Sequence, residues 1–428
     1  MKTFSKVYIP YNGYYSTPFT RWQGSMQNEN PIELGAKTAR RWFLEKKKID
    51  PTVIDYLYYG VSIAHKYLFY SHNWAAGMLT DNKKNVPGLM VNQACTTSTT
   101  ILSLLAKDIE LGVYDVGFGL MSDRCSNGPH TVWPNPMGPG GDLLHENWMM
   151  DNFNADPNVT PPTKMVGTAE NVAKLEGFTK EQSDAVVLRR YEQYMMSQAN
   201  DREFQKKYMF PAEVKLSKKK SILVELDEGV TATTAEGLAK LGPAEKGGIH
   251  SFGAQTFPAD GNVGFIVTNR EKAKELSADP KVEIQVVSYG YSRVNPGFMA
   301  SAPVPAAEMA LANAGLKITD MKAIKSHNPF TTNDLNFAEA EVQTVRGPVS
   351  CAWRRLNDGL ELLVNIPPNS TATVSAPAAP EAKAILTYVE PADANGFEAD
   401  RPPLPEGKQT DRGRTFELGS GKYRLQIH

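Results

Sequence analysis

The sequence has few cysteines, no long apolar run and almost no net charge. Its 3 cysteines lie far apart and belong to no C-x-x-C or Cys/His cluster, which argues against a disulfide framework or a zinc site and favours a reducing compartment. No stretch approaches about 18 uninterrupted apolar residues, so we expect no membrane partner. A net charge of -1 argues against nucleic acid as the main partner, because nucleic-acid-binding surfaces are normally basic.

The first residues, Met1 to Lys6, lack the charged and then apolar pattern of a secretory signal peptide, so we expect a cytoplasmic protein. A length of 428 residues allows two or three domains and a sizeable core. The share of hydrophobic residues, 41%, and of charged residues, 22%, is that of an ordinary globular protein.

One stretch organises the rest of the chain. Leu89 to Ser98 begins as an apolar strand pattern, reaches Cys95 and turns directly into a helix pattern over Thr99 to Gly112. The apolar face of that helix comprises Ile101, Leu104, Leu105 and Ile109. Cys95 is therefore expected next to a helix N-terminus, where the helix dipole favours the thiolate and makes a cysteine nucleophilic. The alternative is a small buried hydrophobic residue without chemistry.

The segments before Cys95 alternate between strand and helix patterns. Lys6 to Pro10 and Val53 to Ser62 read as strands, Pro31 to Lys47 reads as a helix, and another helix begins near Trp74 to Met78. The inner face of the first helix is expected to comprise Ile32, Leu34, Ala36, Ala39 and Phe43. This alternation predicts a layered α/β fold with parallel strands, in which ligands bind at the carboxyl ends of the strands.

Residues 125 to 163 break this pattern, because prolines and glycines are interleaved with Trp133 and Trp148. A long irregular stretch inside a compact domain is often a functional lid or a binding loop, and the alternative is a surface excursion with aromatic anchors. Two helices should follow, one over Thr168 to Glu176 and one capped by Thr179, with Gln182 at the capping-box spacing.

Four segments together resemble the thiolases, in the order and spacing of that family. They are Val91 to Ser98, Asp115 to Asp123, Met165 to Ala173 and Thr179 to Asp184. The resemblance implies that Cys95 is the nucleophile of an acyl-CoA acyltransferase and forms an acyl-enzyme thioester. It also implies a loop domain over the coenzyme A tail at residues 125–165 and a homodimer.

A further segment, Thr256 to Gly264, resembles the part of thiolases that lies close to the pantetheine arm of coenzyme A. The resemblance implies that Ala259, Gly261 and Asn262, together with Met165, contact coenzyme A. Glycines permit such a close approach, although Gly-Asn beside a strand is also ordinary turn chemistry. Coenzyme A or its thioester enters as the substrate, and we expect neither a metal nor a separate cofactor.

The next part repeats the plan of the first, with a strand at Val282 to Ser288, a helix at Pro303 to Ala314 and a strand at Met321 to Lys325. Ser326 to Phe330 then resembles the thiolase segment "NEAF", in a branch that carries histidine. The resemblance implies that His327 donates a hydrogen bond to the developing oxyanion and that Asn328 orients a water or the loop. A purely structural histidine is the alternative.

The thiolase pattern ends near Gln343, and neither of the family's last two active-site motifs, Gly-His-Pro and Cys-x-Gly, occurs in the sequence. Short alternating strands follow, with a hairpin turn at Asn357 to Gly359. Arg346 to Val374 and Gly419 to Tyr423 resemble the C-terminal β-sandwich of bacterial α-L-rhamnosidases.

We therefore expect a thiolase-like N-terminal half over residues 1–270, a partial C-terminal half over residues 271–343 and a β-sandwich accessory domain over residues 344–428. The junction near Gln343 has no linker composition and interrupts a helix pattern, Asn333 to Val342, so a chimera stays open beside a natural fusion.

Three functions follow from this organisation. The first is acyl transfer through Cys95, and the second is an impaired scaffold that still binds acyl-CoA. The third is a carbohydrate-associated β-module, for which Trp353, Tyr388 and Tyr423 would stack on sugars unless they fill the sandwich core.

Overall fold

The computed structural model describes residues 3–135, 141–152, 159, 163–217, 219–327, 337–344, 347–356, 359–376, 381–389, 403–410 and 413–428. The chain divides into two units. Most of the first is Met1–Ala314, and the second comprises Gly315–His327 and Asn333–His428. Among the helices in the described ranges, none is long and apolar enough to cross a membrane.

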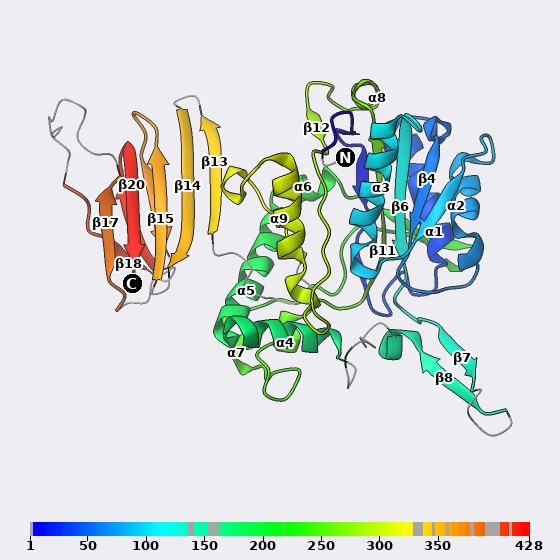
Figure 1. Ribbon diagram of the computed structural model, residues 1–428, viewed down its shortest axis with the longest axis horizontal. Coiled ribbons are helices and arrows are strands. Elements are labelled where there is room, and N and C mark those ends of the chain that lie inside the picture. Colours follow the sequence, from blue (N-terminus) through cyan, green and yellow to red (C-terminus); the bar gives the residue numbers. More distant parts are fainter. Residues whose placement is uncertain are drawn as a thin grey trace. The chain divides into compact units, whose positions relative to one another are not determined.

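The first unit is organised around a mixed sheet of eight strands (Figure 1). Its main path runs in the order β12 (Glu283–Gln285), β1 (Tyr8–Pro10), β11 (Ala259–Thr268), β6 (Val116–Asp123), β4 (Tyr56–Gly60) and β5 (Gly88–Val91), and β2 (Tyr14–Ser16) and β3 (Thr20–Arg21) also pair with β11. Strand β4 runs parallel to both β5 and β6, whereas β11 is antiparallel to β6. The predicted α/β fold with a parallel centre is thus confirmed.

Helices cover both faces of this sheet (Figure 1). They are α1 (Pro31–Arg41), which continues as the π-helical turn η1 (Trp42–Lys47), and α2 (Ser71–Thr80) on one face, and α3 (Thr97–Leu111) on the other. Leu57 and Tyr59 of β4 point toward the α1 side, while Tyr58 between them packs with α3, as the alternation of a strand requires. Each helix contributes the apolar residues that its sequence spacing predicts, including Ile32 in α1 and Ile101 in α3, both fully buried.

The remaining helices of this unit all come after β6 in the sequence. They are α4 (Met165–Glu176), α5 (Lys180–Ser197), α6 (Ala199–Lys206), α7 (Ala235–Lys240), α8 (Arg270–Glu275) and α9 (Pro303–Ala314). The capping box that opens α5 is present, because the Thr179 hydroxyl accepts from the Gln182 N–H and the Gln182 side chain accepts from the Thr179 N–H. A separate hairpin pairs β9 (Ala212–Ser217) with β10 (Lys220–Val224).

The expected irregular stretch after Cys125 contains a hairpin instead. Strands β7 (His130–Pro134) and β8 (Leu143–Asn147) pair antiparallel, and the single π-helical turn η5 (Trp148–Asn152) follows. Most side chains of β7 and β8 are exposed, so no buried and exposed alternation marks these strands in the sequence. The rest of the predicted loop, residues 136–140 and most of 153–162, lies outside the described residues.

The predicted repeat of the first half is only partly present in the described residues up to His327. The helix α9 is found, but β12 pairs with β1 at the edge of the first sheet. No strand forms at Met321 to Lys325, so that prediction was wrong. A short apolar run becomes a strand only where a partner strand completes its hydrogen bonds, and none lies beside it in the described residues.

The second unit contains two antiparallel sheets (Figure 1). One has the order β13 (Phe337–Thr344), β14 (Gly347–Leu356), β15 (Gly359–Ile366), β20 (Gly421–Ile427) and β17 (Ala384–Tyr388), and the other has the order β16 (Ala372–Ala376), β19 (Gly413–Leu418) and β18 (Lys408–Thr410). Leu362, Val364 and Ile366 alternate into the core, where they meet Phe416 and Leu425. The antiparallel β-unit expected after the junction is therefore present, although residues 357–358 of its predicted turn are outside the described ranges.

The helix predicted over Asn333 to Val342 is wrong where the chain is described. Strand β13 already begins at Phe337 and pairs with β14 up to Thr344. The helical spacing of apolar residues in this segment is overridden because β14 pairs with the segment along its full length, from Phe337 to Thr344.

Candidate active site

Cys95 lies at the turn between β5 and α3, as the sequence predicts. A single 3-10 turn, Ala94–Thr96, joins the two elements, and Ala94 adopts the left-handed region with φ 47. The Thr97 side chain fastens this turn, since its hydroxyl accepts from the Gln93 N–H at 2.9 Å and donates to the Ala94 carbonyl at 2.7 Å. The turn therefore presents Cys95 on an exposed surface at the carboxyl end of a parallel strand.

The electrostatic surroundings of Cys95 differ from the expectation. Although part of its surface is open to solvent, the surrounding protein removes much of its hydration, and this burial raises the pKa of the Cys95 thiol. A backbone hydrogen bond lowers it, and the negative charge of Asp123 raises it further. The net direction is thus opposite to the predicted one, because burial and the charge of Asp123 outweigh this backbone hydrogen bond.

Asp123 ends β6 beside the loop that follows β4. Its carboxylate accepts hydrogen bonds from the Ser62 hydroxyl at 2.6 Å, from the Ser62 N–H at 2.9 Å and from the Ile63 N–H at 3.1 Å. Burial nevertheless raises the pKa of Asp123, against these hydrogen bonds. The carboxylate therefore ties two strand ends together next to the candidate nucleophile.

The start of β11 reaches the same edge of the sheet, because Gly261 pairs with Asp123 in the antiparallel ladder. The Asp260 carboxylate, almost fully buried, accepts from the Ser126 N–H at 2.9 Å. Burial first, and then the charges of Asp123 and Asp260, raise the pKa of Cys125 to about 12, so this second cysteine remains a thiol at neutral pH. The structure thus brings Cys95, Cys125 and two carboxylates to one end of the sheet.

Three of the predicted coenzyme A contacts lie at the start of β11. Ala259 is half-buried, and Gly261 and Asn262 are buried. A Cβ on Gly261 would approach the Phe19 ring to 2.7 Å. Glycine is therefore required at this position because the Phe19 side chain packs directly against the backbone. Two polar groups of Asn262 serve the protein itself, because its side-chain oxygen accepts from the Tyr15 hydroxyl at 3.0 Å and its backbone N–H donates to Thr17 Oγ1 at 3.0 Å.

The other predicted site residues lie elsewhere in the chain. Met165 is the first residue of α4 and is half-buried. His327 belongs to the second unit, where burial and the charge of Lys325 lower its pKa and keep the imidazole neutral at neutral pH. Asn328 lies outside the described residues. The geometry therefore groups Ala259 and Gly261 with the end of the sheet that holds Cys95.

Asp123, Cys125 and Asp260 were not predicted as site residues. Asp123 ends a buried strand pattern, Cys125 follows it closely, and Asp260 begins another in the segment Pro-Ala-Asp-Gly. Polar residues at the ends of neighbouring strands were the signal that could have identified them. Within the described part of the chain, no group of three or more His, Cys, Asp or Glu side chains could hold a metal ion.

Family comparisons match this architecture. The family model of the thiolase N-terminal domain matches residues 13–271, and that of the bacterial alpha-L-rhamnosidase C-terminal domain matches residues 327–387. An acetyl-CoA acetyltransferase of Syntrophomonas wolfei is 29% identical over 338 residues, which cover 75% of this chain and 80% of that protein. The human peroxisomal 3-ketoacyl-CoA thiolase is 30% identical over 268 residues, 60% of this chain and 58% of that one.

Solved structures agree on the fold. The crystal structure of human mitochondrial 3-ketoacyl-CoA thiolase superposes with a TM-score of 0.66 at 24% identity and covers 76% of this chain and 80% of that one. The structure of that thiolase in complex with CoA superposes with a TM-score of 0.65. The mixed sheet and the cysteine at its strand-to-helix turn define a thiolase-like α/β protein. The chain belongs to the thiolase family.

Proposed function

We propose that this chain is an acyl-CoA acyltransferase that carries the acyl group as a thioester on Cys95. The observation that carries the proposal is the placement of Cys95, exposed at the turn between β5 and α3, in a member of the thiolase family. The names of the relatives, acetyl-CoA acetyltransferase and 3-ketoacyl-CoA thiolase, support a CoA thioester as the substrate.

In the first step the Cys95 sulfur attacks the carbonyl carbon of the CoA thioester. The new bond joins Cys95 Sγ to that carbon, the bond between the carbon and the CoA sulfur breaks, and the Cys95 proton goes to the departing CoA sulfur. The acyl group then passes to CoA or to another acceptor. Because its pKa is raised, Cys95 is mostly a thiol at neutral pH, so this step depends on removal of its proton.

Several assignments belong to this proposal and stay predictions. They are the oxyanion donor His327 and the orienting residue Asn328, the coenzyme A contacts Met165, Ala259, Gly261 and Asn262, the assembly of the chain as a homodimer, and a cytoplasmic location in lipid metabolism. Ala259 is the least buried of the three β11 residues, which supports its backbone as a contact for an extended arm at this edge.

Intact-mass analysis after incubation with acetyl-CoA tests the proposal. We expect one acetyl adduct on the folded protein, its loss in Cys95→Ala and its retention in Cys351→Ser, since Cys351 lies on β14 of the second unit. A folded protein without an adduct would contradict acyl transfer through Cys95.

A second candidate function is binding of acyl-CoA without turnover. It is favoured by the raised pKa of Cys95 and by the absence of Gly-His-Pro and Cys-x-Gly from the sequence, because removing an activating base commonly slows a reaction by about 100-fold or more. Saturable binding of acetyl-CoA by calorimetry, equal in the wild type and in Cys95→Ala and without any adduct, would support this candidate. Carbon–carbon condensation by the pure protein would exclude it.

A further inference from the structure

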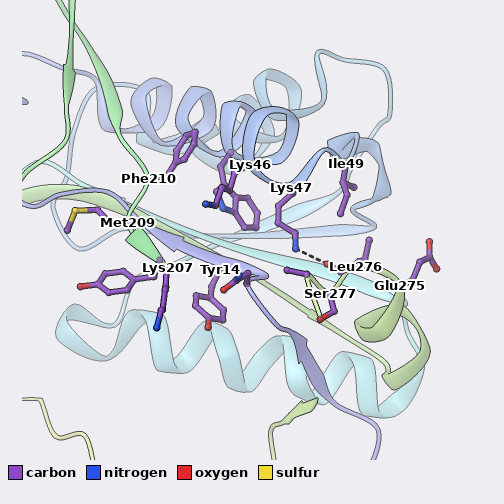
Figure 2. Close-up of a pocket in the computed structure, with 14 residues that line it drawn as sticks. Tyr14, Lys46, Lys47, Ile49, Lys207, Met209, Phe210, Glu275, Leu276 and Ser277 are labelled. Atoms are coloured by element: carbon purple, nitrogen blue, oxygen red, sulfur yellow. Dashed lines mark hydrogen bonds between the residues drawn. The ribbon is translucent and has the colours of Figure 1, made fainter. Parts of the chain in front are cut away.

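A cavity of about 230 Å³ lies in the first unit (Figure 2). Its walls come from four segments that are far apart in the sequence. They are Asn12 and Tyr14 at the turn from β1 into β2, the η1 turn with Ile49 beyond it, the segment 207–210, and the segment 275–278, which begins at the last residue of α8. A neighbouring hollow of about 420 Å³ shares Asn12, Tyr14, Lys207 and Tyr208 with it.

This cavity lies near the amino ends of the parallel strands, whereas Cys95 lies at their carboxyl ends. Lys46, Lys47 and Ile49 belong to the segment that leads into the amino end of β4, whereas Cys95 follows the carboxyl end of the parallel strand β5. The segment 275–278 follows the end of β11 at which Thr268 pairs with Val116, the amino end of β6. The acyl-transfer site therefore does not account for the cavity.

Positive charge dominates the lining. Lys47 is half-buried and its ammonium donates to the Leu276 carbonyl at 2.8 Å, the contact drawn in Figure 2. Burial lowers the pKa of Lys47, as expected for an ammonium that no carboxylate within ion-pair distance compensates among the described residues. Lys46 has no hydrogen-bond or ion-pair partner among those residues, and Lys207 meets Glu203 only at 3.7 Å.

Negative charge is scarce around the same cavity. Glu275 is the one carboxylate among the lining residues, and it is engaged by Lys272 at 2.6 Å. Burying an ammonium without a counter-charge is unfavourable, and an anion placed in the cavity would relieve this. The charge pattern thus selects for an anionic occupant.

Aromatic side chains also line the cavity. Tyr14, Trp42, Tyr208 and Phe210 line the cavity, and the adjoining hollow adds Tyr11 and Phe204. Aromatic faces favour a flat apolar body over a bare inorganic ion. The Asn12 side-chain oxygen is buried and has no hydrogen-bond partner among the described residues, so an acceptor is available for a donor on the same body.

We infer that this cavity binds a small organic anion, a phosphate or carboxylate group on a flat apolar body, at a second site separate from the acyl-transfer site. The lysines hold the anionic group, and the tyrosine rings hold the body. The inference does not depend on the proposed acyl transfer, because the cavity is lined by other residues and lies at the opposite end of the parallel strands from Cys95.

Calorimetric titrations of the full chain in saturating CoA, which fills the proposed acyl-CoA site, test this inference. The probes are phenyl phosphate, benzoate, inorganic phosphate and the neutral phenol. We expect saturable binding of phenyl phosphate or benzoate, weaker binding of inorganic phosphate and none of phenol. Tighter binding of phenyl phosphate would identify a phosphate ligand, and tighter binding of benzoate a carboxylate.

The double variant Lys46→Gln/Lys207→Gln should weaken binding about tenfold or more, because hydrogen bonds to ionised groups are among the strong ones. The matched control Lys48→Gln/Lys206→Gln changes two exposed lysines next in sequence that do not line the cavity, and it should bind like the wild type. Equal affinity of the two double variants, binding of phenol as tight as that of the anions, or no saturable binding of any anion would overturn the inference.

Discussion

The Ser62 hydroxyl donates a 2.6 Å hydrogen bond to the Asp123 carboxylate, so the loop after β4 is fastened to the carboxyl end of β6. The Ser62 N–H at 2.9 Å and the Ile63 N–H at 3.1 Å add further links. Asp123 also raises the pKa of Cys95, which follows β5, the strand on the other side of β4. One carboxylate therefore both holds the edge of the sheet together and opposes ionisation of the candidate nucleophile.

Asp123→Asn should lower the pKa of Cys95, because the substitution removes the negative charge while its side-chain oxygen can still accept from Ser62. Burial, the larger cause of the raised pKa, remains, so we expect a partial decrease. The pH dependence of Cys95 alkylation by iodoacetamide, followed by peptide mass, measures this change.

Asp81→Asn is the matched control, since Asp81 ends α2 in the left-handed region that asparagine also adopts. It should leave the alkylation profile unchanged. A midpoint that stays the same or rises in Asp123→Asn would contradict the role of this charge.

Gly60→Ala should destabilise the first unit and disturb the start of α3. A Cβ at Gly60 would approach Met121 to 2.6 Å, Ile101 to 2.8 Å and the Thr97 methyl to 3.0 Å. Overpacking of this kind costs about 1–3 kcal/mol in the free energy of unfolding, which urea denaturation measures. Gly242→Ala is the control, because nothing lies within 4 Å of its added Cβ. Equal free energies of unfolding for the two variants would contradict the prediction, because they would show that the neighbouring side chains move to accommodate the added Cβ.

The stability of the protein should depend on pH through His65. Burial and then the charge of Arg124 lower its pKa from 6.5 to about 4, so the unfolded chain binds this proton more readily than the folded one. The contribution of His65 to stability is therefore complete above pH 6.5 and is lost as the pH falls toward 4.

Urea denaturation across this pH range measures the effect. His65→Gln should lose less stability on acidification than the wild type, while a glutamine amide can still donate to the Ile63 carbonyl that His65 Nδ1 contacts at 2.7 Å. His428→Gln, at an exposed position, should behave like the wild type. Parallel curves for all three proteins would exclude this role of His65.

Leu425→Ala should destabilise the second unit by about 2–5 kcal/mol, because large-to-small changes in a core leave a cavity. Leu425 is 1% exposed and sits among Val364, Phe416 and Tyr423 in the core. Hydrogen exchange of the β15 and β20 amides measures the loss of protection. Ile385→Ala, at a position that is 36% exposed, should change exchange much less, and an equal effect would contradict the assignment of the core.

Tyr423 also bears on the third function considered from the sequence. It is 3% exposed, and its hydroxyl donates to the Gly419 carbonyl at 3.1 Å, so it fills the core as the alternative interpretation held. Tyr388 packs against the same core with a ring separation of 5.1 Å from Tyr423. The side chain of Trp353 lies outside the described ones.

The elements that sequence reasoning predicted correctly are those with a strong local pattern. Helix α3 has apolar residues at helical spacing and ends at Gly112 in the left-handed region, and α5 opens with its capping box. The elements that it missed depend on partners distant in sequence. The exposed hairpin of β7 and β8 has no amphipathic pattern, and β13 forms because β14 lies beside it.

By itself, the sequence determined the position of Cys95 between a strand and a helix and the alternation of strands and helices around it, because local spacing and end signals encode these features. Only the tertiary structure decided that Asp123, Cys125 and Asp260 gather at the edge that holds Cys95 and that its pKa is raised. The order of strands in the sheet sets those neighbours, and burial among them is the largest cause of the raised pKa of Cys95.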